Sequence, residues 1–239
     1  MRTKAFTALH FFAVGLIGSV LSALLGASAG VAQTPPSERE LRNYAGLHAA
    51  AARGDIAEIE KLIGAGSNPN VADANGRTPL HVAAFRRQHA ATRALLRQGA
   101  NPNALDAQRY DIITIAAVNN DVEMLKIALE GGGNARAVTS PYDGTALIAA
   151  AHLGHVEVVR TLIAAGAPLD HVNNLGWTAV MEAVVLGDGG ANHTATVEAL
   201  VQAKADLNIP DRQRVTPLGH ARARGYSQIA RMLERAGAR

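Results

Sequence analysis

The stretch Gly76-Arg77-Thr78-Pro79-Leu80-His81-Val82-Ala83-Ala84 decides the fold of this 239-residue chain, because related stretches recur before and after it. Aligned on one apolar anchor residue, the copies follow one another at steps of 33, 33, 34, 33 and 38 residues. The anchors are Leu47, Leu80, Ile113, Leu147, Val180 and Leu218. A fixed period of this length indicates a repeat array, in which each unit stacks on its neighbours.

The residues of the quoted stretch predict the start of a helix. Thr78 can cap a helix N-terminus, and Pro79 suits the first turn because its missing N–H group would be unpaired there. Leu80, Ala83 and Ala84 follow at helical spacing. Segments rich in Asp, Asn and Gly separate the copies and predict tight turns. Each unit should therefore contain two helices and a hairpin-like loop, and stacking is needed to bury its apolar face.

The chain resembles the ankyrin repeat family over residues 41–239. The fullest copy, residues 73–105, pairs the quoted helix entry with Leu95-Leu96-Arg97-Gln98-Gly99-Ala100-Asn101-Pro102-Asn103. The resemblance implies an all-α solenoid of about six helix-turn-helix repeats, which binds another protein without catalysis. It also implies that the loop tips and first helices line a concave binding face. The expected repeats are residues 41–72, 73–105, 106–138, 139–172, 173–210 and 211–239.

The first 32 residues have the three-part pattern of an export signal. Two basic residues precede an uncharged, mainly apolar stretch (residues 10–25), and small residues follow it. The pattern predicts cleavage between Ala32 and Gln33 and localisation to the bacterial periplasm. Residues 33–40 are polar and contain proline, so we expect them to form a disordered linker.

A membrane anchor is the alternative for the same segment. The uncharged run from Ala5 to Ser37 could span a bilayer, which needs about 20 apolar residues. If it is retained, the protein is a scaffold tethered to the inner membrane. The small residues before Gln33 and the turn-forming Pro35-Pro36 favour cleavage. Secretion from the cell, as an effector that binds host proteins, is a further alternative.

Charge and composition exclude several classes of function. The formal net charge of +3 is mild, whereas nucleic-acid binding calls for Lys and Arg clustered on one face. We therefore expect no nucleic-acid partner, and we expect a monomer. The sequence contains no cysteine, which excludes disulfides, thiolate catalysis and cysteine-bound metal.

The histidines do not predict a metal site. His152 and His155, with Glu157, could be imagined as ligands, but no cluster of three or four ligands is evident. The family resemblance instead implies that His155 bonds the backbone of a neighbouring loop and that His48 and His81 brace neighbouring turns. No Ser/His/Asp set stands outside the repeat pattern. We expect no catalytic residues, no cofactor and no metal.

The fifth copy contains five extra residues, which the alignment places at residues 188–192, between its two helices. The segment Gly187-Asp188-Gly189-Gly190 lacks the Lys and Ser/Thr of a phosphate loop and has one carboxylate, whereas calcium requires several oxygen ligands. An enzyme or metal site hidden in this insertion stays as an alternative. Insertions in repeats often lie on a binding face, so Asp188 is a candidate partner contact.

Four further residues are candidate contacts because the repeat pattern does not explain them. Arg77, Tyr110 and Trp177 occupy the loop position just before a helix entry, and Tyr142 lies close to that position. Exposed Trp, Tyr and Arg side chains are favoured at the centres of protein interfaces. The alternative for Trp177 is packing against the adjacent loop.

Overall fold

The computed structural model describes residues 33–239. The expected export signal, residues 1–32, and Ala32 of the expected cleavage site lie outside the described residues. Pro35–Arg239 forms one compact unit. None of the helices described is long and apolar enough to span a membrane.

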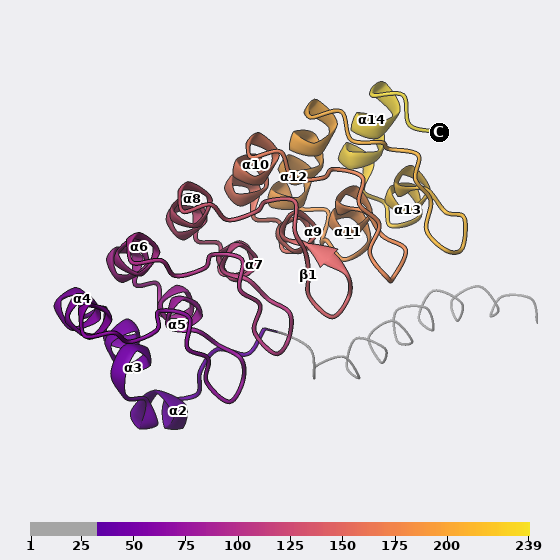
Figure 1. Ribbon diagram of the computed structural model, residues 1–239. Helices are drawn as coiled ribbons and strands as arrows, with labels where there is room; N and C mark the ends of the chain where they lie inside the picture. The colour runs from indigo at the N-terminus through magenta and orange to yellow at the C-terminus, as the bar shows by residue number, and fades with distance from the viewer. Residues whose placement is uncertain (1–32) are drawn as a thin grey trace, which may run out of the picture. The chain divides into compact units, whose positions relative to one another are not determined.

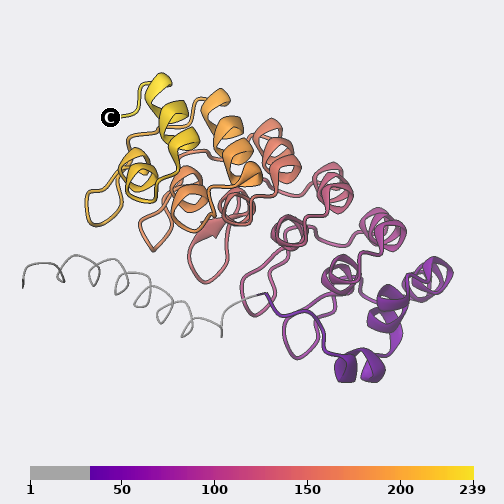
Figure 2. The same cartoon turned by 180° about the vertical axis from the view of Figure 1, so that it is seen from behind.

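The described residues form six pairs of antiparallel helices stacked in two rows (Figure 1), as the sequence predicts. Figure 2 shows the same two rows from behind. The inner row contains α3 (Gly46–Arg53), α5 (Pro79–Phe85), α7 (Ile112–Val118), α9 (Ala146–His152), α11 (Ala179–Val185) and α13 (Pro217–Ala223). The outer row contains α4 (Ile56–Gly64), α6 (His89–Arg97), α8 (Val122–Glu130), α10 (Val156–Ala164), α12 (Ala191–Gln202) and α14 (Ser227–Arg235). Helix α2 (Glu38–Asn43) precedes the array.

Side-chain caps set the starts of five inner helices, α5 to α13, whereas α3 begins after Ala45 without one. The Thr78 hydroxyl accepts a hydrogen bond from the backbone N–H of His81, and the His81 ring accepts one from the N–H of Thr78. Asp111 replaces this threonine in the third repeat and accepts a bond from the Thr114 N–H at 2.8 Å. These caps satisfy N–H groups that have no partner within the helix, so the predicted helix entries are confirmed.

The core lies between the two rows of helices. All six anchor residues that define the sequence period are buried, and the alanine three residues after each anchor is fully buried. Small side chains at this position allow successive inner helices to approach closely, while the anchors fill the space between the rows. The apolar periodicity of the sequence therefore corresponds to one continuous core.

Each repeat from the second onward is preceded by a hairpin-like loop, which we number by the repeat that it opens. The loops are hairpin 2 (residues 65–78), hairpin 3 (98–111), hairpin 4 (131–145), hairpin 5 (165–178) and hairpin 6 (203–216). One polar side chain closes each turn, accepting hydrogen bonds from the backbone N–H groups two and four residues later. These turn residues are Asp73, Asp106, Ser140, Asn173 and Asp211. Hairpin 4 also contains the short antiparallel strands β1 (Val138–Thr139) and β2 (Gly144–Thr145), with Val138 opposite Thr145.

Hydrogen bonds between adjacent tips join the hairpins into one row. The N–H of Ala107 donates to Asn75 O, that of Ser140 to Arg109 O, and that of Asn174 to Tyr142 O, each at 2.9 Å. The side chain of Arg212 extends the row by donating to Asn174 O. The tips also fit closely, since a Cβ atom at Gly76, whose φ is +71°, would lie 2.8 Å from the backbone nitrogen of Ala107. The row is therefore preformed.

Two segment boundaries differ from the sequence-based prediction. Helix α2 begins at Glu38, and Ser37 and Glu40 cap it reciprocally, so residues 38–40 are helical and do not belong to the expected linker. Helix α12 begins at Ala191, so two of the five extra residues expected between the helices of repeat five are helical. The connecting loop is held at Gly187, whose carbonyl accepts a hydrogen bond from the Tyr226 hydroxyl at 2.9 Å.

Candidate functional site

Arg77 and Tyr110, which we expected at exposed loop tips, are buried, with 3% and 6% of their surface exposed. The Arg77 guanidinium pairs with Asp73 at 2.9 Å and with Glu40 of α2. The backbone carbonyl of Tyr110 faces Nε2 of His81 at 3.1 Å, and burial raises the pKa of the Tyr110 hydroxyl to about 12. Neither side chain is available to a partner, because each faces the array.

Arg77, Asp73, Glu40 and Tyr44 form a cluster, the Arg77 cluster, that fastens α2 to hairpin 2. The Tyr44 hydroxyl donates to Asp73 Oδ2 at 2.6 Å, the same oxygen that pairs with Arg77. Burial and this bond raise the pKa of Tyr44. Burial opposes ionisation of Asp73, but the bonds from Tyr44 and Arg77 prevail, so its pKa is lowered. The Glu40 pKa is lowered by bonds from Ser37 and by Arg77.

The other three candidate contacts are at least partly accessible. Tyr142 and Trp177 are half-buried, and the backbones of both belong to the hairpin hydrogen bonds. The side chain of Asp188 is 77% exposed. Its Oδ1 atom accepts a hydrogen bond from the Gly190 N–H and lies 2.8 Å from Nδ1 of His193. Asp188 therefore shapes the inserted loop as well as lying on the surface.

The sequence-based reasoning missed a set of exposed apolar residues. Within the described part of the chain, six large apolar side chains are 41–45% exposed, and five of them lie on hairpins 2 to 5. Those five are Val71, Leu105, Val138, Val172 and Leu175. The sixth, Leu153, lies at the C-terminal end of α9. Each of the first four lies one or two residues before its turn residue, a signal that the sequence alone contained.

Three histidines have structural roles, as the family resemblance implies, although the backbone that His155 contacts belongs to α7 and not to a loop. Nε2 of His48 lies 2.8 Å from Arg77 O, and Nδ1 of His155 lies 2.9 Å from Ala117 O, so both rings link neighbouring repeats. Nε2 of His81 likewise faces Ala104 O and Tyr110 O. Nowhere in residues 33–239 do three or more His, Cys, Asp or Glu side chains gather as metal ligands would.

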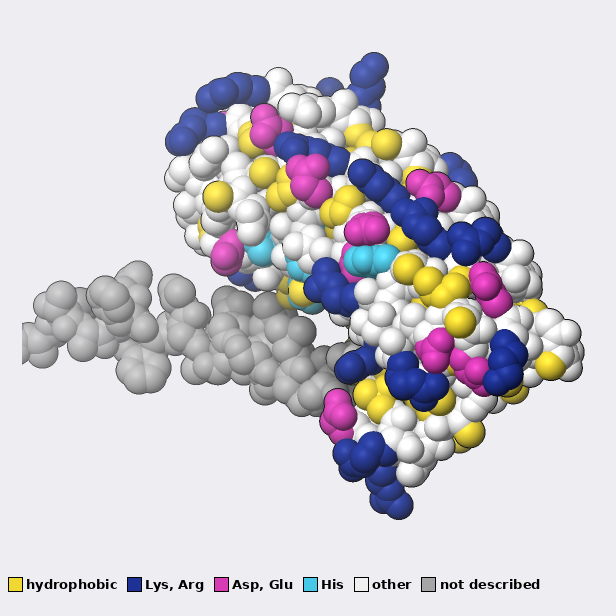
Figure 3. Space-filling view, turned by 90° about the vertical axis from the view of Figure 1, so that its left-hand side faces the viewer, with side chains coloured by type: hydrophobic (Ala, Val, Ile, Leu, Met, Phe, Trp, Pro, Cys, Tyr) yellow, Lys and Arg dark blue, Asp and Glu magenta, His cyan; other side chains and the backbone are white. Residues whose placement is uncertain are grey.

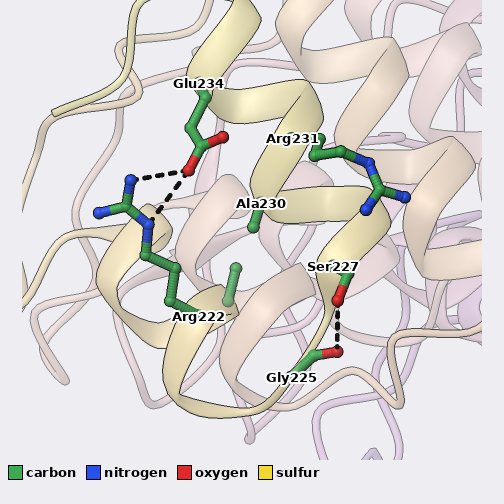
Figure 4. A pocket seen from close by; sticks show the side chains of 7 residues that line it. Arg222, Gly225, Ser227, Ala230, Arg231 and Glu234 are labelled. Carbon is green, nitrogen blue, oxygen red and sulfur yellow. Dashed lines mark hydrogen bonds and ion pairs between the residues drawn. The ribbon is translucent and has the colours of Figure 1, made fainter.

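Two open hollows lie on the surface of the described residues. One, of about 240 Å³, lies at the end of the array between α13 and α14 (Figure 4). Arg222 and Glu234 form an ion pair at 2.7 Å on one side of it, and the Ser227 hydroxyl donates to Gly225 O. These groups are engaged with one another and do not form a nucleophile with an adjacent base.

Charged side chains of both signs are mixed on the face drawn in Figure 3. The ion pairs Arg87–Asp121, Arg93–Glu130 and Arg160–Glu157 join basic and acidic groups of the outer helices and their junctions. On this face, basic and acidic side chains therefore lie side by side.

Comparison with known families matches this architecture. The family model for ankyrin repeats (3 copies) matches residues 9–106, 47–138 and 113–211. The chain belongs to the ankyrin repeat family. Arrays of ankyrin repeats are protein–protein interaction modules, and the fold is in general a non-catalytic scaffold. The family and fold predicted from the repeat period are thus confirmed.

Individual relatives agree with this assignment. An ankyrin repeat domain from Acinetobacter baumannii AYE is 42% identical, with a TM-score of 0.78 over 81% of this chain and 98% of that chain. The human ASB11 ankyrin repeat domain, 24% identical, shares the fold, with a TM-score of 0.68 over 82% of this chain and 85% of that one. A putative ankyrin repeat protein of Escherichia coli K12, YahD, is 38% identical over 98 residues, 41% of this chain. The chain spans about half (49%) of the length of that curated relative.

Proposed function

We propose that this ankyrin repeat protein binds a partner protein in the bacterial periplasm, without catalysis, through hairpins 2 to 5 and the adjoining inner helices. The observation that carries the proposal is the recurrence of exposed apolar side chains on four successive hairpins, whose tips are joined by hydrogen bonds. Exposed apolar residues that cluster are typical of interaction sites, whereas single ones need no explanation. The half-buried aromatic rings of Tyr142 and Trp177 lie on the same hairpins.

The preformed hairpin row favours binding of a folded partner. Backbone hydrogen bonds already join the tips of hairpins 2 to 5, so few backbone torsions need to be ordered when a partner binds. Association is opposed by the ordering of loops and side chains, and a preorganised surface reduces that cost. Large apolar side chains on a rigid support therefore provide most of the expected contact energy.

A pair of matched substitutions tests the proposed face. Leu175 on hairpin 5 and Leu153 at the end of α9 are equally exposed, at 41% each. We expect Leu175→Asp to weaken capture of the partner from a periplasmic extract at least about tenfold, equivalent to about 1.4 kcal/mol. Leu153→Asp should leave capture unchanged, because Leu153 follows the end of α9 that is farthest from hairpin 4. Equal weakening by both variants, with both folded by circular dichroism, would move the interface away from the hairpins.

The periplasmic location is tested by the mass and the fraction of the protein in cells. The export-signal pattern supports a mature chain that begins at Gln33 in the soluble periplasmic fraction. A full-length protein in the membrane fraction would instead support the tethered scaffold. A mature protein in the culture medium would support the secreted effector.

A further inference from the structure

Glu182, on the inner helix α11, is a buried carboxyl group with one unsatisfied oxygen. It is 4% exposed. Its Oε1 atom accepts a hydrogen bond from Nδ2 of Asn173 at 2.9 Å. Its Oε2 atom is buried and takes part in no hydrogen bond with the described residues. Nδ1 of His152, on α9, lies 3.5 Å from Oε2.

Asn173 connects this carboxyl group to hairpin 5. Its Oδ1 atom accepts hydrogen bonds from the N–H groups of Leu175 and Trp177, both at 3.0 Å. The Asn173 N–H also donates to Trp177 O at 3.0 Å. The amide can close the turn with its oxygen only while its nitrogen points toward Glu182, because an amide has one acceptor side and one donor side.

Hairpins 2, 3 and 6 do not need a neighbouring carboxyl group to orient their turn residue. The turn residues of hairpins 2, 3 and 6 are aspartates, which can accept bonds with either oxygen. In hairpin 6, Asp211 closes the turn with Oδ1, and its Oδ2 lies 2.7 Å from Nε2 of His220. His220 follows its turn residue by nine positions, as Glu182 follows Asn173. Repeat five thus places an acid where repeat six places a base.

We infer that Glu182 is a positioning residue for hairpin 5 and that loss of its proton weakens the closure of this hairpin. The protonated group offers Oε1 to Asn173 and directs its hydroxyl toward His152. The ionised group is a buried charge with too few donors, which is costly unless it is hydrated or paired. To gain donors, the carboxylate or its neighbours must move. Asn173 is its hydrogen-bond partner, so this movement disturbs the side chain that closes the turn of hairpin 5.

Of the ionisable side chains on the helices that pack against α11, His152 is the one that contacts Glu182. Helix α11 packs against α9, α12 and α13. Their titratable or charged groups are His152, His193, Glu198, His220, Arg222 and Arg224. His193 bonds Asp188 and His152 O, His220 bonds Asp211, Arg222 pairs with Glu234, and Glu198 bonds Gln202. Arg224 is exposed at the end of α13.

The pKa shifts of Glu182 and His152 agree with their burial. Burial raises the pKa of Glu182 to about 7, although the bond from Asn173 opposes this. Burial, together with repulsion from His193, lowers the pKa of His152. Both shifts favour the uncharged form of each group over a charged pair between them. This inference rests on the proposed function only in that hairpin 5 presents Leu175 and Trp177 to the partner.

Trp177 emission tests the inference without any partner. Trp177 is the single tryptophan of the chain, so its fluorescence reports on hairpin 5 alone. Between pH 5.5 and 8.5 we expect a red shift of several nanometres with a midpoint near pH 7. Glu182→Gln, which keeps the acceptor for Asn173, should abolish the transition, whereas His152→Gln should retain it. An unchanging wild-type spectrum, or a transition that persists in Glu182→Gln, would overturn the inference.

A second variant covers the case in which Glu182→Gln does not fold by circular dichroism. Asn173→Asp places the turn residue of hairpins 2, 3 and 6 in hairpin 5, so the turn can still close. Its second oxygen would then face Glu182, and two adjacent carboxyl groups hold a shared proton more tightly. We expect the midpoint to rise by about half a pH unit or more, and an unchanged midpoint would contradict the inference. Failure of partner capture at every pH, with this transition intact, would count against the proposed function alone.

Discussion

Replacing Arg77 with alanine should destabilise the protein by about 3 kcal/mol, the low end of the range for breaking a buried ion pair. The substitution removes the guanidinium that pairs with Asp73 and Glu40 and leaves the Asp73 carboxylate, whose side chain is 11% exposed, with less compensation. Glu40 is about one-third exposed, with 34% of its side chain accessible, so water can replace part of its interaction and limit the loss. Urea denaturation followed by circular dichroism measures the change in the free energy of unfolding.

Arg86 is the matched control for Arg77. It lies eight residues after Thr78, the last residue of hairpin 2, where it caps the C-terminus of α5, and it is exposed. Arg86→Ala should change stability by less than about 0.5 kcal/mol, as expected for a surface position. Equal losses in the two variants would show that the buried cluster is not what fastens α2 to the array.

Replacing Glu182 with glutamine should stabilise the protein at pH 8 by up to about 3 kcal/mol and have little effect near pH 4. The pKa of Glu182 is raised from 4.5 to about 7 in the folded protein. Between these two pH values, the folded state therefore keeps a proton that the unfolded chain has lost. The wild type therefore loses stability as pH rises from about 4.5 to 7, and the loss remains above pH 7. Glutamine has no proton to lose.

Unfolding curves of the two proteins at several pH values measure this difference. Glu198→Gln on α12 is the control, because Glu198 is exposed and its replacement should give a nearly constant difference across the same range. A difference between wild type and Glu182→Gln that does not grow between pH 4.5 and 7 would contradict the assignment of a buried, protonated carboxyl group.

The repeat period made the fold predictable because it reports local requirements. Thr78 and Pro79 begin a helix wherever they occur together, and an anchor such as Leu80 must be buried in every copy. Local chemistry was sufficient for these features. The family resemblance, rather than local chemistry, implied that His48 and His81 brace neighbouring turns and that His155 bonds a loop backbone.

The candidate site was less predictable because exposure depends on partners that are distant in the sequence. Arg77 is buried since Glu40, 37 residues earlier, closes over it, and no local pattern joins the two. Leu175 was overlooked because an apolar residue beside a turn resembles ordinary core sequence. The role of Glu182 depends on its contact with Asn173 across the repeat, which becomes visible only when the helix and the hairpin are placed together.

Photo-cross-linking in living cells tests the central claim most directly, namely that the hairpin row binds a partner protein. A photoreactive amino acid would be placed at position 175 on hairpin 5 or at position 153 at the end of α9, two positions of equal exposure, 41% each. We predict a discrete cross-linked protein in the periplasmic fraction from position 175 and none from position 153. No adduct from position 175, or the same adduct from both positions, would contradict the claim.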